Sequence, residues 1–205
     1  MPNKTFFNLP QEKQDHIIQQ SISVFATGTY NEITIAALIK GAGIPRSSFY
    51  DYFEDKQDLY KHILDYIGQK KAHYFEASRP EDDFFDELKR LLLASAKFVT
   101  FEPELHAIAN NFLADPVLIN ALYGTTQVDA RDAFKAMLQK GIKLGNLRQD
   151  IDLDFTAKIL TILSMGLMVD GASEKDKPIE DIITEMAYKM TEFVQMGIGK
   201  ASNNA

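Results

Sequence analysis

The sequence of 205 residues contains no cysteine, which excludes disulfide bonds and thiolate metal sites. It also lacks a long apolar run. The longest, residues 159–169, is interrupted by Thr161 and Ser164 and is shorter than the ~20 residues that span a bilayer. The N-terminal residues lack the apolar segment of a signal peptide. We therefore expect a cytoplasmic protein that does not enter a membrane.

Catalytic sequence motifs are absent as well. The four histidines are not spaced as a metal-binding pair on one helix face, and there is no Gly-x-Ser-x-Gly nucleophile motif. The fragment 197–200, Gly-Ile-Gly-Lys, lacks the loop length and the preceding strand of a phosphate-binding loop. We therefore expect no enzyme activity, no cofactor and no metal site.

The composition that remains is ordinary for a globular protein, with 45% apolar and 25% charged residues. Apolar residues recur at helical spacing between turn signals, and no segment has the alternation of a strand. This periodicity predicts an all-α fold. After residue 80 we expect helices at about 84–101, 104–113, 117–144, 155–167 and 178–196, the fourth of them capped by Asp152 or Asp154.

Residues 34–53 have the pattern of two short helices that meet at a glycine turn. Thr34 is a good N-cap for the first helix, and four apolar residues follow it at i, i+3, i+4 and i+7. Gly43 can take the left-handed conformation that ends a helix, and Pro45 fits the start of the next helix. A helix held at such a corner can enter the major groove of DNA.

In the second of these helices, Phe49 and Phe53 are four residues apart and can bury together against the first helix. Asp55 and Asp58 then have the spacing of a helix start, and a longer amphipathic helix follows. We expect the opposite face of the second helix to carry side chains that can reach bases or phosphates, namely Arg46, Ser47, Ser48, Tyr50 and Tyr52.

These residues closely resemble the N-terminal domain of the TetR family of transcriptional regulators. The family pattern appears here as Thr34, the turn at 42–44, the aromatic end of the second helix at 50–53, and Lys56. The segment 11–28 stands where the family has its first helix. The resemblance covers about the first sixty residues. The remainder agrees with the family only in length and helical character.

The resemblance implies a three-helix helix-turn-helix domain at residues 1–55 and a helical ligand-binding and dimerisation domain at 56–205, which begins with a linking helix at 56–77. The implied function is a ligand-responsive repressor that binds a near-palindromic operator in double-stranded DNA as a homodimer. The DNA contacts that the resemblance implies are Thr34, Arg46, Ser47, Ser48, Tyr50, Tyr52 and Lys56.

Three residues, Pro45, Ser47 and Asp51, depart from the family pattern. The carboxylate of Asp51 would repel a phosphate, but it could accept a hydrogen bond from cytosine N4. The alternative for Asp51 is an ion pair with a nearby cation.

Basic side chains are few for a protein that binds DNA. The chain has 22 basic and 29 acidic side chains and a net charge of −7, and residues 1–60 alone carry a net charge of −2. Nonspecific affinity for DNA should therefore be weak, because that affinity comes from counterion release by Lys and Arg. The acidic balance leaves a second interpretation open, a helical protein–protein adaptor that has lost DNA binding.

The last two helices carry apolar stripes that are wider than one neighbouring helix needs. They indicate a homodimer interface, with core inside one chain as the alternative for part of each stripe. Phe155 and Ile162 lie on the first stripe. The expected interface residues are Ile159, Leu163, Gly166, Leu167, Ile183, Met186, Met190 and Phe193.

The middle helices carry aromatic and thioether side chains that suit an adaptable apolar cavity, with polar groups near them in the sequence. The alternative is that these aromatic side chains are core and these polar groups are solvated. The expected effector is a small, largely apolar molecule. The candidate pocket residues are Phe98, Phe101, His106, Asn110, Tyr123, Gln127, Met165 and Met168.

Overall fold

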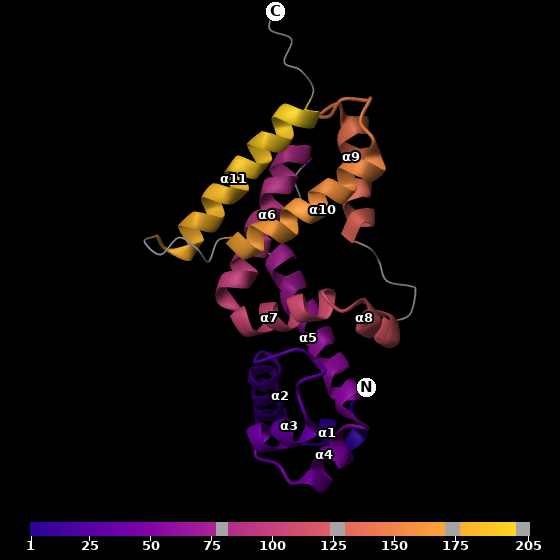
Figure 1. Ribbon diagram of the computed structural model, residues 1–205, viewed down its shortest axis with the longest axis vertical. Helices are drawn as coiled ribbons and strands as arrows, with labels where there is room; N and C mark the ends of the chain where they lie inside the picture. Colours follow the sequence, from indigo (N-terminus) through magenta and orange to yellow (C-terminus); the bar gives the residue numbers. More distant parts are fainter. Residues whose placement is uncertain (77–81, 124–129, 171–176, 200–205) are drawn as a thin grey trace, which may run out of the picture. The chain divides into compact units, whose positions relative to one another are not determined.

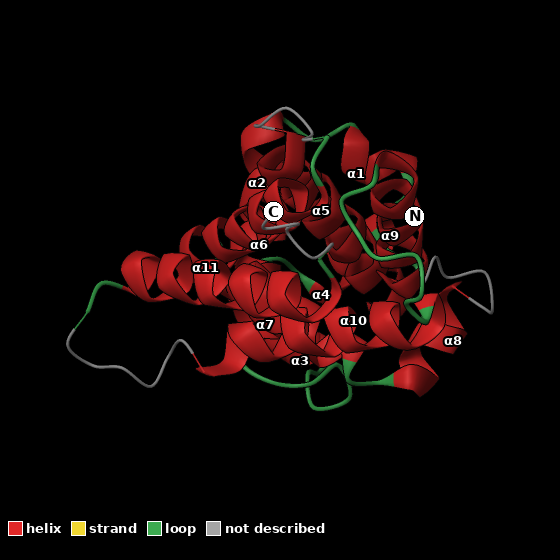
Figure 2. Ribbon diagram, turned by 90° about the horizontal axis from the view of Figure 1, so that it is seen from above, coloured by secondary structure: helices red, strands yellow, loops and turns green. Residues whose placement is uncertain are grey.

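The computed structural model describes residues 1–76, 82–123, 130–170 and 177–199. Helix is the only regular secondary structure in these residues (Figure 2), and a single isolated β-bridge joins Leu147 to Gly199. The predicted all-α fold is confirmed. The helices are α1 (Lys4–Phe7), α2 (Gln11–Phe25), α3 (Ile35–Ala42), α4 (Arg46–Tyr52), α5 (Lys56–Glu76), α6 (Phe84–Phe101), α7 (Pro103–Leu113), α8 (Pro116–Tyr123), α9 (Ala130–Leu144), α10 (Leu153–Asp170) and α11 (Ile179–Ile198).

The chain divides into two compact units, which we call unit 1 and unit 2 (Figure 1). Unit 1 comprises Met1–Ala72 and Glu102–Gln127, and unit 2 comprises His73–Phe101 and Val128–Ala205. The division falls within α5, near its C-terminal end. Unit 1 therefore contains α1 to α4, most of α5, and α7 and α8. The expected domain boundary after residue 55 stays a prediction.

The core of unit 1 forms around the apolar face of α2. Ile18, Ile22 and Phe25, which follow one another at helical spacing, are all buried. The ring of Tyr60 on α5 lies 4.9 Å from the rings of Phe25 and Tyr30, measured between centroids. Burial of Tyr60 raises the pKa of its hydroxyl, because the phenolate form would lose hydration. Aromatic packing therefore joins α5 to α2 and to the loop that follows α2.

The start of α5 is capped as its two carboxylates predict. The backbone N–H of Asp58 donates to the Asp55 carboxylate at 2.8 Å, and the backbone N–H of Glu54 donates to the Asp58 carboxylate at 3.3 Å. The Asp55 carboxylate satisfies an N–H group that the first turn of a helix leaves without a partner, and the Asp58 carboxylate binds the backbone just before the helix.

Helix α1 was not predicted from the sequence. It has four residues, too few for an apolar periodicity to show, yet Phe6 is only 1% exposed. The Phe6 ring lies 5.0 Å from the ring of Phe53 and 6.2 Å from that of Tyr52. The contact partners are thus more than forty residues away in sequence, and α1 is held by tertiary packing rather than by helix propensity.

Unit 2 is a helical bundle in which α6 packs against α9 and α11, and α10 packs against α9 (Figure 1). Arg90 on α6 donates to the backbone carbonyl of Phe75 at 2.6 Å and pairs with Glu87 at 2.8 Å. These bonds tie the last turn of α5 to α6 within this unit. The buried core residues are Phe84, Phe85, Leu88, Leu92, Leu138, Leu147, Ala157, Leu160, Ala187, Met190 and Val194.

The expected helix boundaries hold for α6, α7, α10 and α11. Asp152 accepts the backbone N–H of Phe155 and so is a capping residue of α10, and Pro178 precedes α11. The described parts of the range 117–144, where one helix was expected, are helical as α8 and α9, and residues 124–129 of that range lie outside the described residues.

Among the described residues, no helix has both the length and the apolar content needed to cross a membrane. The expected end of the linking helix at residue 77 lies outside the described residues.

Replacement of Phe6 by alanine should destabilise the protein by about 3 kcal/mol, because a fully buried phenylalanine leaves a cavity between α1, α4 and α5. Urea unfolding followed by circular dichroism measures the change. Phe7→Ala is the matched control, since the neighbouring ring is 50% exposed and its loss should shift the midpoint far less. Equal shifts for the two variants would show that α1 does not pack as described.

Candidate nucleic-acid interface

The corner between α3 and α4 forms as the sequence predicts. The Thr34 hydroxyl accepts the backbone N–H of Ala37 at 3.2 Å and caps α3. Gly43 ends α3 with φ 63° and ψ 31°, in the left-handed region that glycine enters without steric penalty. The backbone N–H of Ile44 then donates to the carbonyl of Ile39 at 3.2 Å and closes the turn. Helix α4 therefore starts from a fixed corner.

The inner face of α4 is aromatic and buried. Phe49 and Phe53 are 1% and 0% exposed, with ring centroids 5.6 Å apart, as their spacing predicts. Tyr52 lies on this face too and is 7% exposed. The expectation that Tyr52 lies on the outer face is wrong, because a residue three positions after Phe49 comes back to the same side of a helix.

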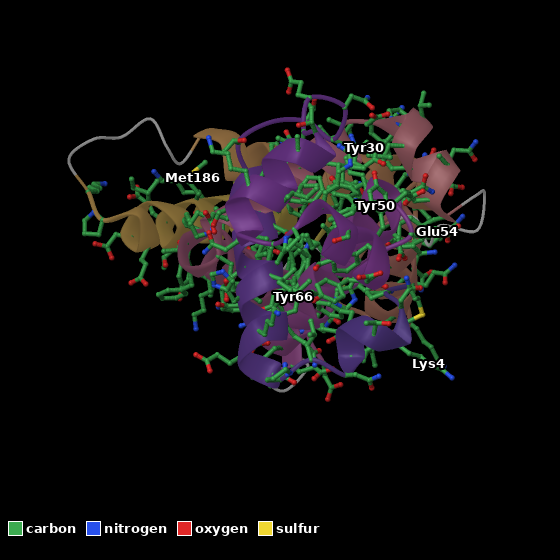
Figure 3. The ribbon with its side chains drawn as sticks, turned by 90° about the horizontal axis from the view of Figure 1, so that it is seen from below. Lys4, Tyr30, Tyr50, Glu54, Tyr66 and Met186 are labelled. Atoms are coloured by element: carbon green, nitrogen blue, oxygen red, sulfur yellow. The ribbon has the colours of Figure 1, made fainter. Side chains whose placement is uncertain are left out.

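The outer face of α4 carries the polar side chains. Arg46, Ser47, Tyr50 and Asp51 are exposed, and Ser48 is half-buried at the edge of the face. The guanidinium carbon of Arg46 lies 5.9 Å from the centre of the Tyr50 ring. Figure 3 labels Tyr50, and it shows Lys4 extending outward from α1. This face thus presents a cation, two hydroxyl groups and a carboxylate side by side, groups that can bond to bases and phosphates.

Lys56 forms intramolecular hydrogen bonds that the sequence did not indicate. Its ammonium group donates to the backbone carbonyls of Tyr30 and Ile33 at 2.7 and 2.8 Å and lies 4.0 Å from the centre of the Tyr30 ring. Partial burial lowers the pKa of Lys56, since the charged form loses hydration. Lys56 therefore ties the start of α5 to the loop before α3. Its contact with a phosphate stays a prediction.

The C-terminal end of α4 is held by Asn3, a residue that the sequence did not single out. The backbone N–H of Asn3 donates to the carbonyl of Tyr52 at 2.8 Å, and its side-chain amide donates to the carbonyl of Asp51 at 3.4 Å. These bonds satisfy carbonyl groups that the end of a helix leaves without partners. No local pattern could reveal them, because the partners are 48 and 49 residues apart along the chain.

The sequence model of the family described as "Bacterial regulatory proteins, tetR family" matches residues 17–63, the segment that contains this corner and the start of α5. This segment belongs to the DNA-binding domain of TetR-family regulators. The chain is a DNA-binding transcriptional regulator.

Three relatives show how far the similarity to TetR-family proteins extends. The repressor KstR2 of Mycolicibacterium smegmatis is 22% identical over 160 residues, which cover 74% of this chain and 75% of that protein. The uncharacterised regulator YhgD of Bacillus subtilis is 21% identical over 169 residues, 82% of this chain and 87% of its own. A TetR-family regulator from Chloroflexus aurantiacus has a solved structure that superposes with a TM-score of 0.82 at 25% identity, covering 98% of this chain and all of that one.

The predicted pocket residues fall into different units. His106, Asn110 and Tyr123 belong to unit 1, and Phe98 and Phe101 belong to unit 2. His106 and Asn110 meet, with Nε2 of the ring 2.9 Å from the side-chain amide nitrogen. Burial and the charge of Lys71 lower the pKa of His106. Gln127 lies outside the described residues, as do the side chains of Met165 and Met168.

Within unit 2, Phe98 is buried against Tyr74 at 5.8 Å, and Phe101 is 56% exposed. A cavity of about 330 Å³ lies elsewhere in this unit, where α6 and α9 meet. Its apolar wall includes Phe84, Leu91 and Met137, and none of the predicted pocket residues lines it. Among the described residues, no three His, Asp or Glu side chains gather as metal ligands.

The predicted interface residues on α10 and α11 differ in exposure. Phe193 is 69% exposed, and Ile159, Leu163, Ile183 and Met186 are half-buried. Met190 is 7% exposed and belongs to the core of unit 2, so it is not available on the outer surface. The exposure of Gly166 and the side chain of Leu167 lie outside what the structure describes. Met196, which is not among the predicted interface residues, is 84% exposed three residues after Phe193.

Alanine substitutions at Arg46 and Lys56 should distinguish a side chain that contacts a base from one that holds the DNA-binding surface in place. Arg46→Ala should relax the preference at one base pair of each half-site by about tenfold, since an arginine that bonds a base edge carries that much discrimination. Lys56→Ala should weaken binding to every sequence alike, because the loop before α3 loses its tie. Fluorescence anisotropy with a panel of singly substituted duplexes measures both effects. A uniform loss for Arg46→Ala would show that Arg46 touches only the DNA backbone.

Proposed function

We propose that this chain is a repressor that binds a near-palindromic operator as a homodimer and responds to a small, largely apolar effector. The observation that carries the proposal is the fixed, exposed polar face of α4, opposite a buried aromatic face. A helix-turn-helix dimer of this kind places two such helices in successive major grooves, about 34–36 Å apart. Bound in that way, it blocks access to the promoter.

The direct DNA contacts in this proposal come from the outer face of α4 and from the cap of α3. Arg46 and Ser48 lie nearest the base edges, and Thr34, Ser47 and Tyr50 bond phosphates. Tyr52 and Lys56 support this surface, the first by packing under α4 and the second by holding the loop before α3. Exposed Lys4 and Lys40 add positive charge to unit 1.

The dimer is supported by apolar side chains that unit 2 leaves in solvent. Phe155 and Ile162 on α10 are 61% and 53% exposed, and they lie on the side of the helix opposite the buried Ala157 and Leu160. Phe193 and Met196 form a second exposed pair on α11. Exposed apolar groups gathered on adjacent helices mark protein–protein contacts. A second copy of unit 2 would bury them.

The response to an effector is supported by the position of α7 in unit 1. The Asn111 side chain on α7 donates to the backbone carbonyl of Gly28, in the turn after α2, at 3.0 Å. The Phe112 ring lies 6.4 Å from that of Tyr60 and 5.8 Å from that of Tyr123. Any displacement of α7 therefore acts directly on the DNA-binding helices. An effector that prefers a displaced α7 lowers operator affinity by its difference in affinity for the two states.

The protein–protein adaptor is the competing proposal. It draws on the net charge of −2 over residues 1–60 and on the engagement of Lys56 with backbone carbonyls, which leaves few cations for DNA. An adaptor would use the same exposed surfaces without sequence preference for DNA.

Selection of bound duplexes from a random pool tests the proposed function. We expect a consensus with two-fold symmetry and half-sites about one helical turn apart, because the two copies of α4 are held in fixed register. The experiment is run at low salt, where weak electrostatic contacts are strongest. Enrichment of no sequence under that condition would reject the repressor and favour the adaptor.

Phe193→Asp should dissociate the dimer at micromolar concentration, since it puts a charge into an apolar contact. Sedimentation velocity measures the change from dimer to monomer. Tyr188→Asp is the control, because Tyr188 is 53% exposed on another side of α11, where its ring faces Lys89 on α6. A variant of Phe193 that remains dimeric would show that α11 does not contribute to the interface.

A further inference from the structure

Asp51 lies at the centre of the outer face of α4. It follows Ser47 by four residues, so the two side chains are neighbours on one side of the helix. Phe49, Tyr52 and Phe53 occupy the opposite side and are buried. If α4 enters the major groove of DNA, Asp51 therefore faces the bases on the groove floor rather than the phosphates at the groove edge. A carboxylate in that place requires a physical reason, because phosphates repel it.

The sequence left two roles open for Asp51, an ion pair or a contact with a base. The structure gives no support to the ion pair: the carboxylate has neither a cationic partner nor a hydrogen-bond donor among the residues that the structure describes. The nearest cation on the same helix, Arg46, is directed toward the ring of Tyr50. The four acceptor sites of the carboxylate are thus available to a ligand.

The backbone under Asp51 is fixed at both ends of α4. Asn3 donates its side-chain amide to the Asp51 carbonyl, and its backbone N–H to the Tyr52 carbonyl. At the other end, the left-handed Gly43 sets the start of the helix. Because the side chain is short and its backbone is fixed, its staggered rotamers keep the acceptor atoms within a small range of positions in front of α4.

We propose that Asp51 is a specificity-determining residue that selects cytosine in each half-site by accepting a hydrogen bond from the N4 amino group. The inference rests on the proposed function, since it requires that α4 enters the major groove. Only cytosine and adenine present an amino donor there. In adenine the acceptor N7 lies beside that amino group and repels the second carboxylate oxygen, whereas cytosine presents a C–H group at that place. Guanine and thymine present acceptors and are rejected.

The same carboxylate weakens contact with the wrong sequence. When it enters the groove without meeting a donor, it loses hydration and stays unpaired, which is strongly unfavourable for a charged group. It also adds repulsion from the phosphates at every sequence. Asp51 therefore raises specificity at the expense of affinity, in keeping with the low positive charge of residues 1–60.

The experiment compares the wild type with Asp51→Ala and Asp51→Asn in random-pool selection, followed by affinity measurements on the selected duplex. The wild type should select cytosine at one symmetric position in each half-site, and a change of that base pair should weaken binding about tenfold. Asp51→Ala should remove this preference and bind unrelated sequences more tightly. Asp51→Asn should shift the preference toward adenine, to which an amide can bond at both N6 and N7.

Glu54→Gln is the matched control for charge. Glu54 is exposed just beyond the end of α4, close to Tyr50 in Figure 3, but lies outside the helix. Its substitution should raise affinity for all sequences alike and leave the consensus unchanged. Thermal unfolding of each variant verifies that the fold is kept, as expected for exposed side chains.

The outcomes separate the two proposals. If the wild type selects a symmetric consensus and the Asp51 variants select the same one, the role of Asp51 is overturned while the proposed function stands. The role is also overturned if Asp51→Ala and Glu54→Gln act alike, since the effect is then one of charge only. If the wild type selects no sequence, the proposed function fails and the inference fails with it.

Discussion

The packing of three phenylalanines beneath α4 is the constraint on which the DNA-binding surface depends. Phe49 and Phe53 bury one side of a helix of only seven residues, and Phe6 covers them from α1. A helix so short has little stability of its own, so this packing decides both that it forms and which side faces solvent. The exposed polar face follows from this packing, because the α4 side chains on the side away from the phenylalanines point into solvent.

That surface carries little positive charge, which determines how it can bind DNA. With Lys56 bonded to two carbonyl groups and Asp51 on the outer face, electrostatic attraction to the phosphates is weak. Affinity then has to come from well-placed hydrogen bonds, and these require a rigid helix. The capping of α3 by Thr34, the turn at Gly43 and the bonds from Asn3 provide that rigidity. A surface with little positive charge therefore needs a rigidly held helix to bind DNA.

Local patterns in the sequence predicted the parts of this surface that local interactions determine. Thr34 caps its own helix and Gly43 ends it, so residue type and spacing were sufficient. The parts that depend on distant partners could not be predicted: Lys56 bonds to backbone carbonyls, which exist at every residue, and α1 is too short to show a period. Tyr52 was misplaced for a different reason: its helical spacing from Phe49 indicated burial, but it was expected on the outer face with the other polar side chains.

The division of the chain through α5 also explains how a distant helix can influence DNA binding. Helix α7 follows unit 2 residues in sequence but packs in unit 1, where Asn111 bonds to the turn after α2. The rings of Tyr123, Phe112, Tyr60 and Tyr30 are consecutive neighbours from α8 to the loop that Lys56 holds. Because close-packed rings cannot shift independently, a displacement at α7 or α8 changes the support of that loop. In the proposed function, such a displacement would couple an effector to operator affinity without any contact between the effector and α4.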